Sequence, residues 1–185
     1  MCPTFTPQLL TSALIYIHDH KYNLVRCWAL LDTCASANFI TETVKRLGLS
    51  SISQSIPVGA INTMSSKSKS IVRIIIQSTQ GHFNRKITCL TLPIITDLIP
   101  SETFPRDAIE IPSNIKLADP EFHLPCPINL LIGSRVTLSL LSIGQIDLSD
   151  DGHDLYLQKT RLGWVIAGSS PKQNMNKRAS CCSLV

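Results

Sequence analysis

Short runs of apolar residues recur along the whole chain, and each ends in a polar or glycine-containing turn. The runs are too short for most helices, and many alternate apolar with polar residues, which is typical of strands. This pattern predicts a mainly β domain, closer to a small closed barrel than to an α/β sheet. The segments that we expect to contain strands are 12–19, 24–31, 53–78, 85–95, 127–133, 143–148, 154–160 and 162–168.

Two segments depart from the β pattern. Between Phe39 and Leu49 apolar residues fall three or four positions apart, which predicts one short amphipathic helix that ends at Gly48. Six prolines lie between Pro100 and Pro127. Because proline interrupts a helix, we expect an extended surface excursion there.

The length of 185 residues suits one domain that can bury a core of its own. Hydrophobic residues make up 44% of the chain and charged residues 16%, which excludes a disordered protein. We divide the chain into an N-terminal extension (1–9), a folded domain (10–170) and a polar, aperiodic tail (171–185) that we expect to be disordered.

Composition also restricts the compartment and the partners. No apolar run reaches the roughly 18 residues that span a bilayer, and the N-terminus shows neither a basic leader nor a cleavage site. We therefore expect an intracellular, cytoplasmic protein without membrane contact, whose seven cysteines are free thiols. The net charge is +4, and three of the positive charges lie in the tail, so we expect no nucleic-acid surface on the domain. We also expect no cofactor.

An aspartate in an unusual setting is the strongest candidate for chemistry. In "ALLDTCASANFIT" Asp32 follows an apolar run and precedes the small residues Thr33, Cys34 and Ala35. It could cap a helix, or it could be a catalytic acid at the end of a buried strand. One carboxylate is a weak base at neutral pH, whereas two carboxylates held within about 3 Å share a proton and can act as base and acid. No other aspartate has this setting, so a catalytic Asp32 needs a second copy of the chain.

Two other kinds of site are weaker alternatives. His18 and His20 alternate on one strand and Cys27 follows on the next, which could suggest zinc, but a solvated hairpin turn explains the histidines and we expect no metal. Cys34 could be a thiol nucleophile only with a histidine partner, and the sequence places none.

The segment "ALLDTCASANFITETVKRLGL" resembles the active-site segment of retroviral-type aspartic proteases. "INLLIGSRV" resembles their second signature, an apolar strand that ends in glycine beneath the catalytic turn. The longer match is to the peptidase domain of BEL/Pao-type retrotransposon polyproteins. It covers roughly residues 10–170 in order, through "SALIYIHD", "CWALLDTCASANFITETVKRLGL", "ITDLIP", "LADPEFHLPCPINLLIGS" and "LQKTRLGWVIAGS".

The resemblance implies a retropepsin-like closed β-barrel with one short helix after the catalytic turn, active as a homodimer on a peptide or polyprotein. It implies that Asp32 of each copy is catalytic, that Thr33 hydrogen-bonds across the dimer, that Ala35 keeps the turn compact and that Gly133 allows close packing. A hairpin over residues 57–72 would be the flap over the substrate. The flap residues implied to contact substrate are Val58, Gly59, Ala60, Ile61 and Asn62.

One residue departs from the family pattern, because Cys34 stands where the family has glycine. If the position needs a positive φ angle, a side chain there costs roughly 1–2 kcal/mol in each copy. The leading hypothesis is therefore an aspartic endopeptidase that cuts its own polyprotein. The alternative is a catalytically silent dimerisation or peptide-binding module of the same fold, and a generic β-rich monomeric adaptor is a third possibility.

Overall fold

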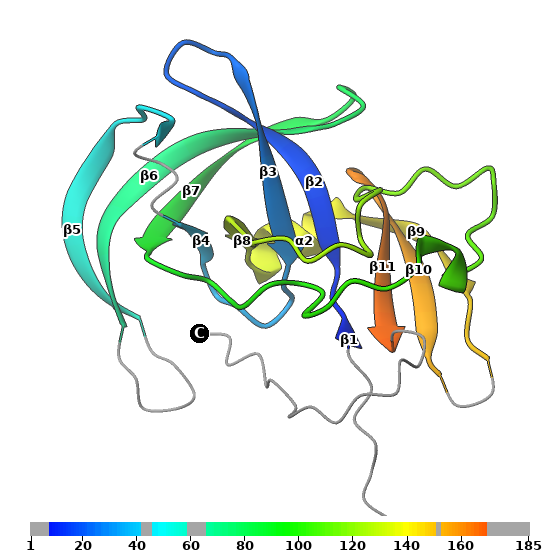
Figure 1. The fold of residues 1–185 in the computed structure, drawn as a ribbon. Coiled ribbons are helices and arrows are strands. Elements are labelled where there is room, and N and C mark those ends of the chain that lie inside the picture. The colour runs from blue at the N-terminus through cyan, green and yellow to red at the C-terminus, as the bar shows by residue number, and fades with distance from the viewer. Residues whose placement is uncertain (1–7, 42–45, 59–65, 151–152, 170–185) are drawn as a thin grey trace, which may run out of the picture.

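The computed structural model describes residues 8–41, 46–58, 66–150 and 153–169, and these form two β-sheets joined by one short helix (Figure 1). Strand accounts for 50% of the structure and helix for 8%, so the prediction of a mainly β fold is confirmed. The strands are β1 (Gln8–Leu9), β2 (Ser12–His18), β3 (Leu24–Leu31), β4 (Asn38–Thr41), β5 (Ser51–Val58), β6 (Ser66–Ser78), β7 (Asn84–Leu92), β8 (Leu130–Ile132), β9 (Leu141–Asp147), β10 (Leu155–Thr160) and β11 (Gly163–Ser169). The helical elements are η1 (Arg106–Ala108) and α2 (Ser134–Leu140).

The larger sheet closes on itself and forms a barrel of six strands. Its hydrogen-bonded order is β2–β3–β8–β4–β7–β6, and a second pairing between β2 and β6 completes the ring. Strand β5 pairs with β6 alone and lies outside the ring. The predicted closed barrel is therefore confirmed, and closure leaves the six ring strands without a free edge.

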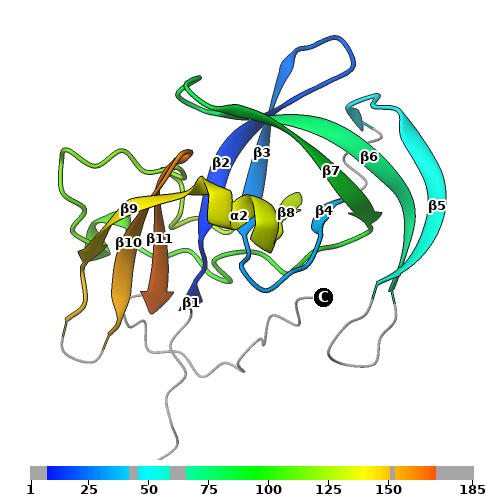
Figure 2. The same ribbon diagram turned by 180° about the vertical axis from the view of Figure 1, so that it is seen from behind.

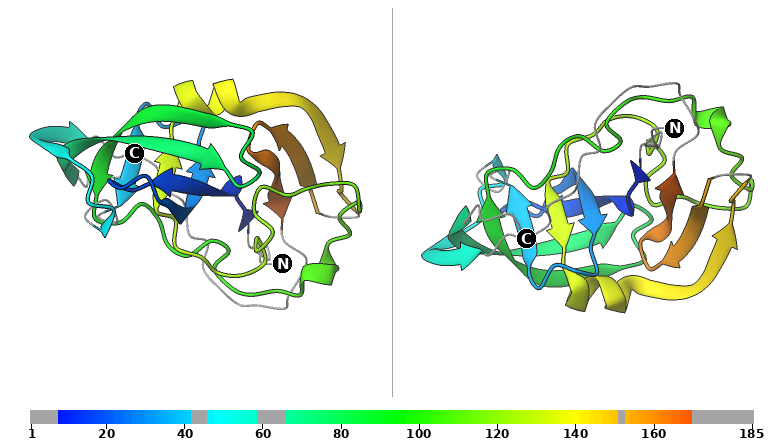
Figure 3. Two further views of the ribbon diagram at one scale, coloured as in Figure 1. Left: turned by 90° about the horizontal axis from the view of Figure 1, so that it is seen from above. Right: turned by 90° about the horizontal axis from the view of Figure 1, so that it is seen from below.

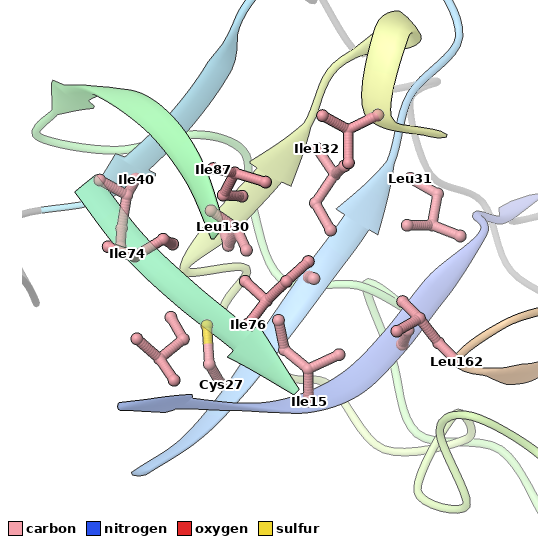
Figure 4. Packing of buried hydrophobic residues seen from close by; sticks show 14 of the residues in the cluster. Ile15, Cys27, Leu31, Ile40, Ile74, Ile76, Ile87, Leu130, Ile132 and Leu162 are labelled. Atoms are coloured by element: carbon pink, nitrogen blue, oxygen red, sulfur yellow. The ribbon is translucent and has the colours of Figure 1, made fainter. Parts of the chain in front are cut away.

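Alternating aliphatic side chains fill the interior of the barrel (Figure 4). Ile15, Ile74, Ile76, Leu130 and Ile132 are all buried there. Because successive side chains of a strand point to opposite faces, the alternation in the sequence becomes one inward row for each strand. Each such side chain contributes about 1.5–3 kcal/mol by leaving water.

The smaller sheet has the order β1–β11–β10–β9 and lies beside the barrel (Figure 3). Gln8 and Leu9, which the sequence analysis assigns to an N-terminal extension, form β1 and pair with Ser169 and Gly168. We call this sheet the C-terminal sheet. Seen from behind, α2 connects the barrel to β9, the edge strand of the C-terminal sheet (Figure 2).

The segment 100–127 contains no long helix and most of its residues are exposed or half-buried, as predicted, but it also buries apolar side chains that the prediction missed. Phe104, Ile109 and Phe122 are buried against one face of the C-terminal sheet. The sheet needs this cover because the apolar side chains on that face would otherwise meet water. The segment is therefore irregular and lies at the surface, with a few apolar side chains that anchor it to the sheet.

The helix expected between Phe39 and Gly48 is wrong in its first part. Phe39 and Ile40 belong to β4 in the barrel, Arg46 is helical, and residues 42–45 lie outside the described part. Gly48 has a positive φ of 63°, as expected of a glycine at a helix end.

No helix in the described ranges is long and apolar enough to cross a membrane.

Candidate active site

Asp32 lies directly after β3, between two strands of the barrel wall. β3 runs parallel to β8, with Leu31 opposite Ile132, and the Asp32 N–H donates to the Ile132 carbonyl at 2.9 Å. Thr11 adds a second clamp, because its hydroxyl donates to the Leu31 carbonyl at 2.6 Å. Hydrogen bonds to the backbone of Leu31 and Asp32 therefore hold the end of the strand on both sides.

The two oxygens of the Asp32 carboxylate differ in their surroundings. The residue is 6% exposed. Oδ1 accepts a hydrogen bond from the Cys34 N–H at 2.7 Å, whereas Oδ2 is buried and has no partner in the part of the chain that the structure describes. A buried carboxylate oxygen without a hydrogen-bond donor is energetically costly, so this setting is unusual for an aspartate.

The turn after Asp32 is compact and carries two exposed side chains. Ala35 is buried, while Thr33 and Cys34 are exposed to solvent. The turn leads into β4 rather than into a helix, so the interpretation of Asp32 as a helix cap is wrong. Tyr22 is the one non-glycine residue with positive φ in the described ranges. Cys34 therefore has no left-handed backbone conformation, and its exposed side chain carries no such conformational cost.

Gly133 packs beneath this turn, as the second signature implies. A Cβ built on it would lie 2.9 Å from the Ala35 carbonyl oxygen and would also collide with the Ala37 carbonyl. Its N–H donates to Asn38 Oδ1 at 2.9 Å, and the next N–H, that of Ser134, donates to the Ala35 carbonyl at 2.8 Å. Because its φ is −72°, the need for glycine is steric rather than conformational.

Strand β8 walls the acid from the barrel side. It lies between β3, to which it is parallel, and β4, to which it is antiparallel. Leu130, Leu131 and Ile132 are all buried, as expected. Thr137 of α2 donates to the Ile132 carbonyl at 2.6 Å and so ties the helix to the same strand. The sequence did not reveal the role of Thr137, although its position one turn after Gly133 was a possible signal.

A groove of about 560 Å³ lies beside the turn, between Thr33 and the face of the C-terminal sheet that segment 100–127 leaves open. Tyr156 and Gln158 of β10 line it, together with Leu141 and Gln145 of β9. Strand alternation puts these side chains on one face. Alternation alone does not show which face of the sheet stays uncovered, so the sequence did not predict that these residues line a groove.

The implied flap coincides with the hairpin of β5 and β6. The two strands pair from Ser51–Val72 out to Val58–Ser66. Of the flap residues, Val58 ends β5, and Gly59, Ala60, Ile61 and Asn62 lie outside the described residues. The arms of the hairpin are thus as predicted, and the contacts of its tip stay a prediction.

The cysteines and histidines considered for other chemistry do not form a common site. Cys27 and Cys89 are in the barrel core, where burial raises the pKa of Cys27 to about 12 and also raises the pKa of Cys89. His18 Nε2 is 3.0 Å from Gln77 Oε1, and His20 Nδ1 is 3.2 Å from the Leu47 carbonyl. Within the described ranges no group of three His, Cys, Asp or Glu side chains could hold a metal ion.

Fold and site together define a mainly β protein with a closed six-strand barrel and a buried acid on a turn in its wall. No family model, no curated protein and no solved structure matched this chain. The function therefore has to be inferred from the geometry of the site and from the sequence resemblance.

Proposed function

We propose that the chain is a retropepsin-like aspartic endopeptidase of a BEL/Pao-type retrotransposon polyprotein, and that it acts as a homodimer. The observation that carries the proposal is the half-satisfied carboxylate of Asp32: one oxygen is held by the Cys34 N–H and the other is buried without a donor. In a dimer, Asp32 of the second copy across a two-fold axis would supply the second carboxylate. Two carboxylates that share one proton are the pair that this chemistry needs.

In the proposed reaction the ionised carboxylate takes a proton from water, and the water oxygen attacks the peptide carbonyl carbon. The protonated carboxylate donates its proton to the carbonyl oxygen as that oxygen gains charge. The hairpin of β5 and β6 would close over the peptide and exclude water. Thr33, which is exposed beside the acid, would contact its counterpart in the other copy and hold the two turns together.

An exposed apolar strip supports the dimer. Leu138 at the end of α2 is 62% exposed and Ile143 in β9 is 100% exposed, with Leu141 partly exposed between them. β9 is an edge strand of its sheet, and Leu141 also lines the groove beside Thr33. An unpaired edge with exposed aliphatic residues favours association. A second copy on this edge would bring its own acid turn toward the first.

The test is cleavage of a peptide library between about pH 4 and 7, the range in which a shared-proton pair is singly protonated. Asp32→Asn keeps the acceptor for the Cys34 N–H and removes the titrating group, so we expect cleavage to fall to background. Pepstatin should inhibit the wild type. Asp107→Asn, an exposed acid in η1, is the matched control and should cleave like the wild type.

The exposed Cys34 favours one alternative, a silent peptide-binding module, because it adds a side chain where the family has glycine. A wild-type dimer that binds library peptides without cutting them, and that binds them equally well as Asp32→Asn, would establish that alternative. A wild type that neither cleaves nor binds, although sedimentation shows a folded dimer, would refute both.

A further inference from the structure

A second pocket opens on the other side of the acid turn, and the proposed peptidase chemistry does not use it. Its volume is about 410 Å³, and it shares no lining residue with the groove beside Thr33. Three cationic side chains line it, Arg85 and Lys86 from β7 and Arg135 from α2. Known ligand pockets have volumes of about 300–1,000 Å³, so there is room for a small molecule.

The offset between two paired strands creates this pocket. β4 begins at Asn38, which pairs with Cys89, so residues 85–88 of β7 extend beyond the start of β4. The Asn38 side chain donates to the Thr88 carbonyl at 2.9 Å and closes one end. Arg85 donates to the Ser139 hydroxyl and links β7 to α2 on the other side. The walls are thus held by the barrel and the helix.

No acidic residue of the described part of the chain compensates the positive charge of the pocket. None of its lining residues is an aspartate or a glutamate, and none of its three cationic residues forms an ion pair within the described ranges. Arg85 is half-buried, and Ser139 is its one hydrogen-bond acceptor there. A guanidinium carries five N–H donors, so an anion in the pocket would gain charge-assisted hydrogen bonds already oriented for it.

The rest of the lining is largely aliphatic. Ile87 and Val136 are buried and Ile71 is half-buried, and all three are among the residues that line the pocket. An inorganic anion alone would leave this apolar surface against water. We propose that the pocket binds a small organic anion, in which a carboxylate or a phosphate group is carried on a short apolar body. The anionic group contacts Arg85 and Arg135, and the apolar body covers the aliphatic side chains.

The test is calorimetric titration of the whole chain with four probes: hexanoate, hexyl phosphate, inorganic phosphate and hexan-1-ol. We expect the first two to bind, and the inorganic anion and the neutral alcohol to bind at least about tenfold more weakly, because each lacks one of the two recognition elements. Comparing hexanoate with hexyl phosphate identifies the preferred head group. Equal binding of inorganic phosphate and hexyl phosphate would overturn the apolar part of the proposal, and binding of none would overturn all of it.

Two variants locate the site. Arg135→Gln removes one exposed charge and should weaken hexanoate binding about tenfold, the effect of one charge-assisted contact. Lys159→Gln makes the same charge change on β10, outside the pocket, and should bind like the wild type. Equal weakening by both variants would mean nonspecific attraction and would refute the pocket. Binding is the readout, so the outcome does not depend on whether the chain cleaves peptides.

Discussion

At the scale of single residues, the acid turn is a place where small side chains and buried polar groups are tightly coupled. Asp32 and Ala35 belong to the same turn, and Gly133 packs directly beneath it. Each of the three residues is held by hydrogen bonds or by close packing. A rigid turn of this kind suits a carboxylate that must meet a symmetry mate within about 3 Å. Small changes of volume beneath the turn should therefore affect both stability and the position of the acid.

Gly133→Ala tests this coupling. The added methyl group would lie against the Ala35 and Ala37 carbonyl oxygens, which are backbone atoms and cannot rotate away. We expect the free energy of unfolding, measured by urea denaturation, to fall by about 1–3 kcal/mol. Ser134→Ala, at the next position, removes a hydroxyl that forms no hydrogen bond in the described structure, and should change stability by less than about 0.5 kcal/mol. Equal effects of the two substitutions would mean that the turn adjusts freely.

Asp119 should make stability depend on pH in an unusual direction. Burial raises its pKa, and hydrogen bonds from the Glu121 N–H and the Ser12 hydroxyl only partly oppose this. Because the folded pKa lies above the unfolded one, the contribution of Asp119 is fully present below the unfolded pKa of about 3.9 and is lost as pH rises through the folded pKa. We therefore expect Asp119→Asn to gain stability relative to the wild type as pH rises above about 4.

The measurement is urea denaturation of both proteins at several pH values, with Asp19→Asn as the control of opposite sign. Hydrogen bonds from Asn23 and Lys21 lower the pKa of Asp19, so its contribution is present at high pH and lost as pH falls. Relative to the wild type, Asp19→Asn should lose stability as pH rises. A pH-independent difference between the wild type and Asp119→Asn would contradict the assignment.

At the scale of elements, segment 100–127 acts as a third layer without regular structure. Phe104 and Phe122 pack at 5.9 Å between ring centroids under the C-terminal sheet, and the backbone of Ala118 bonds to Leu14 of the barrel and to Trp164 of β11. The segment therefore links the barrel and the C-terminal sheet as well as covering one of them.

Phe122→Ala should show how much the fold depends on this segment. The ring is 2% exposed, and truncation of a buried phenylalanine costs about 3–5 kcal/mol through lost burial and the cavity that remains. Leu124→Ala, two residues away and 38% exposed, should cost less than about 1 kcal/mol. The midpoints of urea denaturation separate the two results. Similar small losses would show that the segment is only a surface loop.

The sequence predicted individual strands better than it predicted their partners. Period-two patterns and turn residues located five of the six barrel strands, all except β4, because inward side chains in a barrel alternate. Apolar residues spaced three or four positions apart led to a wrong helix prediction for Phe39 and Ile40. The spacing continued across the boundary between β4 and the residues that follow it. Proline-rich composition could not show that Phe104 and Phe122 are buried, because the sheet that covers them is distant in sequence.

Within the candidate site, local features could be predicted and long-range ones could not. Asp32, Ala35 and Gly133 belong to short motifs whose chemistry is visible in sequence, and the structure brings them together. Tyr156, Gln158 and the cationic pocket result from the packing of strands and α2 against distant neighbours. Such juxtapositions depend on register, which a single sequence specifies only weakly.

At the scale of the whole molecule, the proposed activity depends on a surface of this chain meeting the same surface of another. The barrel places Asp32 at one end of β3 and Leu24 at the opposite end. The exposed aliphatic strip on α2 and β9 lies on the side of the molecule that carries the groove beside Thr33. A two-fold axis near this strip would bring two acid turns together, whereas an axis near Leu24 would keep them apart.

Ile143→Lys is the direct test of that interface. The side chain is 100% exposed in the single chain, so lysine should leave the monomer fold and its circular dichroism unchanged. In a dimer it would place like charges across the axis, and we expect the dissociation constant from sedimentation velocity to rise at least about tenfold. Leu24→Lys makes a similar change at the far end of β3 and should dimerise like the wild type. If Ile143→Lys dimerises normally while Leu24→Lys does not, the two-fold axis lies far from Asp32, and a shared catalytic pair is excluded.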